Sequence, residues 1–284
     1  MDPNADEALV TLHNAGGDEA TISLHGAQLL SWKAAGREQI YWSPLSRPAA
    51  DRAVRGGVPV CFPQFGERGP LPRHGLVRTR RWEMASFPAP HARIAEGRWQ
   101  FDGLPATLGW PHPFRLVLVV RLGPRWLELA LEAHNTGPQP LDFTAALHTY
   151  LAVDDVRQAS LTGLQGLAYE DALDGNTLKT EKAPALRVDG EIDRVYRGVP
   201  PALELRDGNG LRRLHQQGFA DAVVWNPGLP RDARFADMPP QDWTRMLCIE
   251  AAAIENPVSL QPGAVWRGRQ RIELPDADGF EPAS

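Results

Sequence analysis

Cysteine is scarce in this chain: Cys61 and Cys248 are the only two among 284 residues. Two cysteines are too few for a disulfide framework in a chain of this length, so we expect free, buried thiols in a reducing compartment. No stretch approaches roughly 18 uninterrupted apolar residues, which argues against a transmembrane helix. The first residues carry acids and no long apolar run, so we expect no signal peptide. These absences predict a cytoplasmic protein without a membrane partner.

Several motifs that carry chemistry are also missing. The sequence has no Walker loop and no G-x-S-x-G nucleophile elbow. It has no paired-histidine metal motif and no Cys-x-x-Cys. Gly56 and Gly57 are not followed by a helical pattern, so they do not form a dinucleotide fingerprint. We therefore expect no metal and no cofactor, and the net charge of -5 argues against nucleic-acid binding over the whole surface.

Short alternating runs separated by turn residues dominate what is present. The chain holds 26 prolines and 26 glycines, and prolines at this frequency disfavour long helices. The segment Trp126–His134 shows the pattern best, because its leucines alternate with acidic or small residues. The expected strands span residues 20–24, 28–32, 39–42, 114–122, 126–134, 141–153, 202–206, 211–216, 222–225, 245–251 and 265–274. A helical turn is expected at 237–243 with Asp237 as its cap, and residues 275–284 are expected to form a frayed tail.

No amphipathic helix of ordinary length, no internal repeat and no low-complexity linker interrupts this series of strands. Many short strands with almost no helix predict an all-β sandwich or barrel. We interpret residues 1–284 as a single β-sandwich domain with its core at about 20–274, and we expect a monomer.

A cluster of arginines stands out in this acidic chain. From Arg47 to Arg81 there are eight arginines, no lysine and only two acids, Asp51 and Glu67, which leaves a local excess of +6. Like charges repel unless solvent or a bound anion screens them, so this excess predicts an anion site. Arginine in place of lysine favours planar, bidentate recognition of phosphate or carboxylate.

Two titratable side chains lie in expected strands. Alternation puts His148 on one face with Ala146 and Tyr150, where the small residue leaves room for a ligand. Glu250 lies in an apolar strand and shares a face with Cys248. Burial there raises the pKa of the carboxyl group and makes it a better general base. The alternatives are a hydrogen-bonded structural histidine and a glutamate that lies on an outer face or is neutralised by an arginine.

Three further residues lie in loops or at strand ends. His74 lies near Arg73 and Arg78, so we expect it to stay neutral and to donate a hydrogen bond to a hydroxyl. The glycine after it allows a positive φ or a close backbone approach. Asp193 is either a ligand contact or part of a solvated charge run. Trp225 ends a strand, where an indole stacks on a sugar face or packs against the core.

Six blocks of this sequence together resemble the glucose-6-phosphate 1-epimerase branch of the aldose 1-epimerase family. In order they are RGG-VPVCFPQFG, LPRHGLVR, LHTYLAV, EIDRVY, VVWNPG and MLCIEAA. They cover roughly residues 20 to 274, and the first two are the most specific. The resemblance implies a large antiparallel β-sandwich, the galactose-mutarotase-like supersandwich, with its site in a cleft on one sheet and no cofactor.

The same resemblance implies roles for individual residues. It places the catalytic histidine at His148 and the catalytic glutamate at Glu250. The substrate-binding residues that it implies are Arg55, Arg73, His74, Arg78 and Asp193. Relatives often have glutamine at position 73, where an amide donates and accepts, whereas the guanidinium of Arg73 only donates. At Gly228 relatives commonly have an aromatic residue.

The residues and the resemblance predict one reaction, the interconversion of the α and β anomers of hexose 6-phosphates, with glucose 6-phosphate as the expected substrate. Ring opening needs a base at the C1 hydroxyl, for which Glu250 is suited, and an acid at the ring oxygen, for which we expect protonated His148. The alternatives are a mutarotase for unphosphorylated aldoses and a non-catalytic sugar-phosphate-binding protein. A glycoside-processing enzyme fits less well, because that chemistry usually uses two carboxylates.

Overall fold

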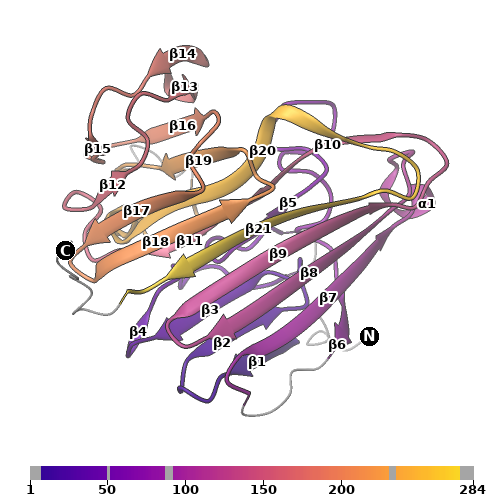
Figure 1. Ribbon diagram of the computed structural model, residues 1–284, viewed down its shortest axis with the longest axis horizontal. Coiled ribbons are helices and arrows are strands. Elements are labelled where there is room, and N and C mark those ends of the chain that lie inside the picture. Colours follow the sequence, from indigo (N-terminus) through magenta and orange to yellow (C-terminus); the bar gives the residue numbers. More distant parts are fainter. Residues whose placement is uncertain (1–7, 50–51, 87–91, 230–234, 276–284) are drawn as a thin grey trace, which may run out of the picture.

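A computed structural model describes residues 8–49, 52–86, 92–229 and 235–275. Within these ranges strands dominate, and the helical segments are short: α1 (Pro105–Leu108), η2 (Ala172–Asp174) and η3 (Pro240–Arg245). None of the helices in the described ranges is long and apolar enough to cross a membrane. The predicted all-β fold is confirmed (Figure 1). The expected frayed tail, beyond Pro275, lies outside the described residues.

Two large antiparallel sheets and one small sheet build the protein (Figure 1). The nine-stranded sheet has the order β15-β12-β17-β18-β21-β9-β8-β7-β6. Its strands are β6 (Glu83–Ser86), β7 (Ala95–Gly103), β8 (Phe114–Gly123), β9 (Trp126–Asn135), β12 (Ser160–Thr162), β15 (Ala185–Leu186), β17 (Ala202–Asp207), β18 (Gly210–Gln217) and β21 (Val265–Glu273).

The eight-stranded sheet carries the residues of interest. Its order is β14-β13-β16-β19-β20-β10-β5, and β11 also pairs with β20. Its strands are β5 (Val60–Cys61), β10 (Leu141–Leu147), β11 (Tyr150–Ala152), β13 (Ala168–Asp171), β14 (Thr177–Thr180), β16 (Ile192–Tyr196), β19 (Asp221–Asn226) and β20 (Met246–Leu260). The small sheet consists of β1 (Leu9–His13), β2 (Glu19–Ser23), β3 (Leu29–Ala34) and β4 (Arg37–Glu38), in that order.

Alternation along the strands separates the core from the candidate site. On β9, Leu127 and Leu129 are fully buried, as the sequence pattern predicts, and each buried leucine contributes about 2 kcal/mol. On β20, Leu247 and Ile249 belong to the same main core. Glu250 follows Ile249 and therefore points to the opposite face of the eight-stranded sheet. One face of this sheet thus closes the core, and the other presents side chains for chemistry.

Most expected strands are present, with ends shifted by a residue or two. The expected strand at 39–42 is wrong, because Ile40 and Trp42 form only isolated bridges. The backbone N–H of Gln39 donates to Trp32 and that of Tyr41 to Tyr150, so this segment crosses between two sheets instead of joining either. The sequence pattern also missed several strands, including β1, β7, β13 and β16.

Three other expectations need correction. The expected strand at 141–153 is two strands, and His148 lies in the short break between β10 and β11. The strand expected to end at Ala251 continues to Leu260. The helical turn is present as η3, but its N-cap residue is Pro239 and not Asp237, because the Asp237 carboxylate pairs with Arg55.

Candidate active site

Neighbouring strands of the eight-stranded sheet bring the candidate residues together on one face. A row of cross-strand partners consists of Asp193 on β16, Trp225 on β19, Cys248 on β20 and Tyr150 on β11. Such partners have Cβ atoms about 4.5–5.5 Å apart. Glu250 lies two residues along β20 from Cys248, and His148 lies two residues before Tyr150, so both point to the face of this row. Residues that are distant in sequence therefore meet because of strand register.

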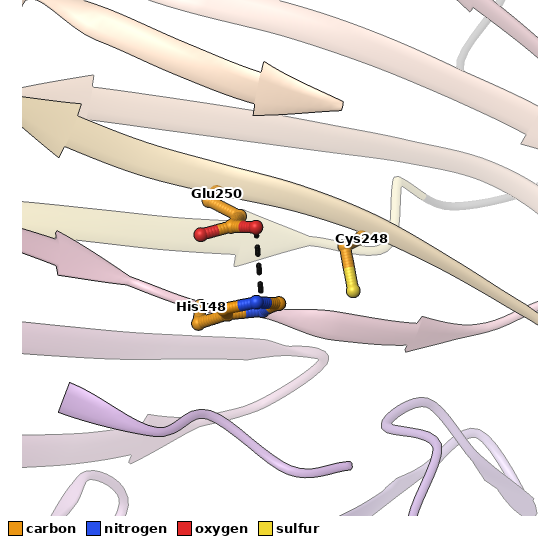
Figure 2. Close-up of side chains that lie close together, drawn as sticks. All are labelled: His148, Cys248 and Glu250. Carbon is orange, nitrogen blue, oxygen red and sulfur yellow. Dashed lines mark ion pairs between the residues drawn. The ribbon is translucent and has the colours of Figure 1, made fainter. Parts of the chain in front are cut away.

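His148 and Glu250 form a buried pair at the centre of this face. His148 Nδ1 lies 3.3 Å from Glu250 Oε1, and the side chains are 10% and 1% exposed. Figure 2 shows the imidazole facing the carboxylate across the two strands. The break between β10 and β11 is fixed by the backbone, because the N–H of His148 donates to the carbonyl of Pro59 at 3.0 Å.

The surroundings of this pair move its two pKa values in opposite directions. Burial lowers the pKa of His148 well below its usual value, and the nearby His74, Arg78 and Arg55 act in the same direction. Burial also raises the pKa of Glu250 well above its usual value, as the sequence predicts. Both shifts have the same main cause, because burial disfavours the charged form of each group. Burial thus opposes the protonated His148 that the acid role needs, and that role stays a prediction.

Aromatic rings form the walls around His148. Tyr150 stacks on the imidazole with ring centroids 4.8 Å apart and an interplanar angle of 11°. Trp225 meets the imidazole edge-on at 6.1 Å, and His74 does so at 5.3 Å. Trp225 is partly exposed, so its indole packs against the site and keeps an open surface. These contacts hold the imidazole in one orientation.

His74 reaches the site from a loop whose backbone demands glycine at the next position. His74 has φ 64°, and Gly75 has φ 81°. A Cβ on Gly75 would lie 2.1 Å from the carbonyl oxygen of Phe62, so the expected close approach is confirmed. The backbone N–H of Gly66 donates to His74 Nδ1 at 3.4 Å, which places the proton of a neutral imidazole on Nε2.

The expectation that His74 stays neutral is confirmed. Burial lowers its pKa to about 3, and Arg78, Arg73 and Arg55 add to this effect. With its Nδ1 accepting from the backbone, the ring offers one donor, Nε2–H, to a ligand. That is the group expected to meet a sugar hydroxyl.

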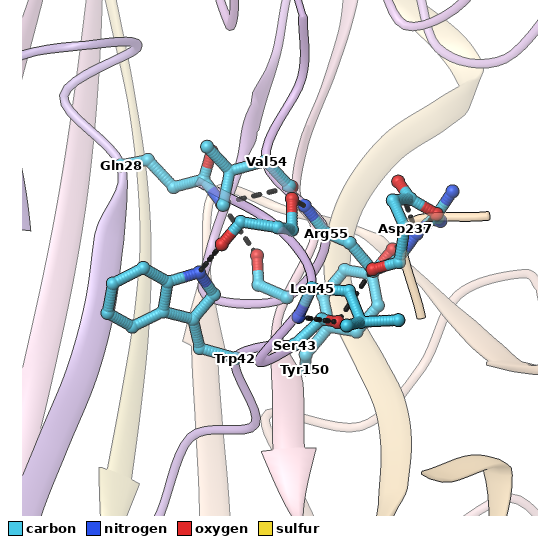
Figure 3. A network of polar contacts seen from close by, with 10 residues as sticks. Gln28, Trp42, Ser43, Leu45, Val54, Arg55, Tyr150 and Asp237 are labelled. Carbon is cyan, nitrogen blue, oxygen red and sulfur yellow. Dashed lines mark hydrogen bonds and ion pairs between the residues drawn. The ribbon is translucent and has the colours of Figure 1, made fainter. Parts of the chain in front are cut away.

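Arg55 is held by a network that the sequence analysis did not foresee (Figure 3). Its Nε lies 3.3 Å from each carboxylate oxygen of Asp237, and its Nη1 donates to the Tyr150 hydroxyl at 3.2 Å. The guanidinium also lies over the ring of Phe235, 4.9 Å from the centroid. The Ser43 hydroxyl donates to the Asp237 carbonyl at 2.6 Å and fixes that loop. Arg55 is therefore oriented before any ligand binds.

The remaining predicted residues lie at the edge of the same face. Arg78 Nη2 donates to the carbonyl of Arg73 at 3.0 Å, and the Arg73 side chain is exposed. Burial raises the pKa of Asp193 to about 6, and Arg73 opposes this shift. Arg68 forms an ion pair with Glu170, and its charge also opposes the raised pKa of Asp193. The arginine cluster of the sequence therefore contains an ion-paired member as well as the predicted site residues.

Sequence reasoning missed two residues of the site. Tyr150 was placed on the face of His148 but given no role, although the alternation was a usable signal. Asp237 was interpreted only as a helix cap, and no sequence pattern links it to Arg55, 182 positions away. Cys61 and Cys248 are both free and buried, as expected. Cys248 joins His148 and Glu250 in one cluster of potential metal donors.

Known proteins are similar to this chain over most of its length. The sequence profile of the aldose 1-epimerase family matches residues 8–273. A relative from Cenchrus ciliaris, provisionally named glucose-6-phosphate 1-epimerase, is 35% identical over 272 residues, which are 92% of this chain and 82% of the relative. A relative from Escherichia coli K12 with the same provisional name is 32% identical over 240 residues, covering 82% of this chain and 79% of the relative.

Solved structures give the same fold. A provisionally assigned mutarotase from Salmonella typhimurium superposes with a TM-score of 0.84 at 26% identity and covers 93% of this chain and 89% of its own. Galactose 1-epimerase from Lactobacillus acidophilus superposes with a TM-score of 0.73 at 16% identity, with 96% of each chain covered. The expected galactose-mutarotase-like β-sandwich is confirmed.

Proposed function

The chain belongs to the aldose 1-epimerase family, and from that premise we propose that it is a mutarotase, an isomerase that interconverts the α and β anomers of hexose 6-phosphates. The observation that carries the proposal is the buried pair of His148 and Glu250, 3.3 Å apart, on the face of the eight-stranded sheet that also carries Cys248 and Tyr150. This pair holds one donor and one acceptor for protons, which is what anomer exchange requires. Glucose 6-phosphate is the proposed substrate, as in the names of the relatives.

The reaction proceeds by paired proton transfers. Glu250 removes the proton from the C1 hydroxyl, the bond between C1 and the ring oxygen breaks, and His148 gives a proton to that oxygen. Rotation about the C1–C2 bond exposes the other face of the aldehyde, and closure reverses both transfers. Proton transfer between Glu250 and His148 across their 3.3 Å contact prepares the carboxylate for the base role and the imidazolium for the acid role. General acid–base catalysis contributes on the order of 10²–10⁴-fold for each group.

The residues around the pair are suited to hold the sugar phosphate. The oriented guanidinium of Arg55, the Nε2–H of His74 and the carboxyl group of Asp193 face the same region and offer donors and an acceptor for hydroxyls. Arg73 and Arg78 add positive charge at the edge, where a phosphate is bound most strongly by paired guanidinium contacts. The binding residues we propose are Arg55, Arg73, His74, Arg78 and Asp193.

Exchange spectroscopy tests this proposal directly. NMR exchange between α- and β-glucose 6-phosphate should accelerate when the protein is added at micromolar concentration. Glu250→Gln should lower the rate by at least about 100-fold and leave binding of the sugar phosphate largely intact. No acceleration by the wild-type protein would refute the activity, and unchanged exchange in the variant would remove Glu250 from the base role.

Two alternatives predict different results. A mutarotase for unphosphorylated aldoses would act equally on glucose and glucose 6-phosphate. A non-catalytic sugar-phosphate-binding protein would bind saturably without exchange. A monomer of one domain, acting in the cytoplasm without cofactor, nucleic acid or membrane partner, stays a prediction.

A further inference from the structure

The cluster of His148, Cys248 and Glu250 has a property that mutarotation does not use. One ligand atom from each side chain lies within 4.8 Å of the other two, and all three residues are buried. Figure 2 shows the three side chains converging from two facing segments of the sheet. Cys248 takes no part in ring opening, yet its thiol completes a set of imidazole, thiol and carboxylate. Each of these three groups is a ligand type that zinc accepts.

The spacing of the cluster suits a tetrahedral ion after a small adjustment. Zinc bonds of about 2.0–2.3 Å place neighbouring ligand atoms about 3.5 Å apart. His148 Nδ1 and Glu250 Oε1 are already 3.3 Å apart. The other separations, which are at most 4.8 Å, need to close by at most about 1.3 Å, which a rotation of the side chains would allow.

Two polar atoms of the cluster form no hydrogen bond. Among the described residues, Glu250 Oε2 is buried without a hydrogen-bond partner, and His148 Nδ1 has only its 3.3 Å ion-pair contact with Glu250 Oε1. A buried polar atom without a partner costs about 1–3 kcal/mol. A bound cation would coordinate both atoms at once. Cation binding would therefore remove the free-energy cost of leaving them without hydrogen bonds.

We infer that a soft divalent cation such as Zn²⁺ binds His148, Cys248 and Glu250 and reversibly blocks the acid–base pair. Thiolate and imidazole ligands select Zn²⁺ over Mg²⁺, which prefers oxygen. The inhibitory part of this inference rests on the proposed function, whereas the binding part does not.

Cadmium spectroscopy tests the site without any need for turnover. Cd²⁺ added to the full-length protein should produce a thiolate-to-metal charge-transfer band in the ultraviolet that saturates at one ion per chain. Cys248→Ala should abolish the band. Cys61→Ala is the matched control, because Cys61 is also a free, buried cysteine but lies outside the cluster, and it should keep the band. Cys248→Ser, with circular dichroism of each variant, guards against a folding defect.

The activity arm measures the same site by inhibition. Zn²⁺ should slow anomer exchange, a chelator should restore it, and Mg²⁺ should have no effect. Inhibition is measured relative to each variant's own rate without Zn²⁺. The Zn²⁺ concentration for half inhibition should rise at least about tenfold in Cys248→Ala. In Cys61→Ala it should match the value for the wild type. Absence of the band in the wild type, or its persistence in both Cys248 variants, would overturn the inference.

The two arms also separate this inference from the proposed function. A band that depends on Cys248 in a protein without exchange activity would refute the mutarotase and retain the metal site. Exchange that is insensitive to Zn²⁺, with no band, would retain the mutarotase and refute the metal site.

Discussion

Asp193 allows the electrostatics of the site to be tested through protein stability. Burial raises the pKa of its carboxyl group from 3.8 to about 6, while Arg73 opposes the shift and Glu191 adds to it. Since the pKa of the folded state lies above that of the unfolded chain, protonated Asp193 contributes stability that is fully present below pH 3.8 and is lost as the pH rises through about 6. The ionised group is therefore a cost at neutral pH.

The substitution Asp193→Asn keeps the shape and removes the charge. A shift of about two pKa units corresponds to a change of about 3 kcal/mol in the free energy of unfolding. We expect the variant and the wild type to be equally stable near pH 4, and the variant to be more stable by up to about 3 kcal/mol near pH 8. Other titrating groups cancel, because they are common to both proteins.

Urea unfolding at the two pH values measures this difference. Asp189→Asn is the matched control, since Asp189 lies four positions away on the chain but is exposed, and its effect should vary little with pH. If the difference between Asp193→Asn and the wild type is the same at both pH values, the reasoning about burial is refuted. The same variant should bind the sugar phosphate more weakly, because an amide replaces the proposed carboxyl contact.

Three further changes test other parts of the site. Asp237→Ala removes the carboxylate that orients Arg55 and should raise the KM for glucose 6-phosphate about five- to tenfold with a smaller change in kcat; equal losses in both would contradict a positioning role. Gly75→Ala forces a Cβ to 2.1 Å from a backbone carbonyl, whereas Gly36→Ala has a similar positive φ and open space. Thermal unfolding should show Gly75→Ala to be the less stable by at least about 2 kcal/mol, and similar melting temperatures would disprove the steric argument. Arg78→Ala should weaken catalysis with glucose 6-phosphate but not with glucose, as comparison of kcat/KM for both sugars will show; parallel losses would exclude a phosphate contact.

The sheet fold could be predicted from the sequence because the alternation of apolar and polar residues depends only on near neighbours in the chain. Alternation on β9 and β20 depends on neighbouring residues, and it placed Glu250 on the same face as Cys248, which the structure confirms. The segment at 39–42 has the same local pattern, yet its backbone bonds to two different sheets. Whether an apolar segment pairs into a β-sheet depends on which strands lie beside it in the fold. The residues near it in the chain do not reveal this.

The sequence named candidate residues that the structure brings to one face of the sheet, but it did not reveal the electrostatics of that face. His74 was expected to be neutral because two arginines lie near it in the sequence, and burial makes it so. For His148 the decisive influence is the depth of the pair beneath the rings of Tyr150 and Trp225, which no residue near it in the chain reveals. The contact between Asp237 and Arg55 could not be predicted either. The two residues are 182 positions apart, and no local sequence pattern links them.

The ion pairs of the arginine cluster indicate which arginines should attract a phosphate group most strongly. Arg55 already has a carboxylate partner in Asp237, and Arg68 has one in Glu170. Within the described part of the chain, no carboxylate pairs with Arg73 or Arg78. A dianionic phosphate placed beside Arg55 must share it with Asp237, whereas one placed beside Arg78 and Arg73 competes only with Asp193, whose pKa Arg73 influences without a direct ion pair among the described residues. Since Coulomb attraction is weakened by every competing anion, the phosphate should bind at Arg73 and Arg78, which leaves Arg55 to hold hydroxyls near the catalytic pair.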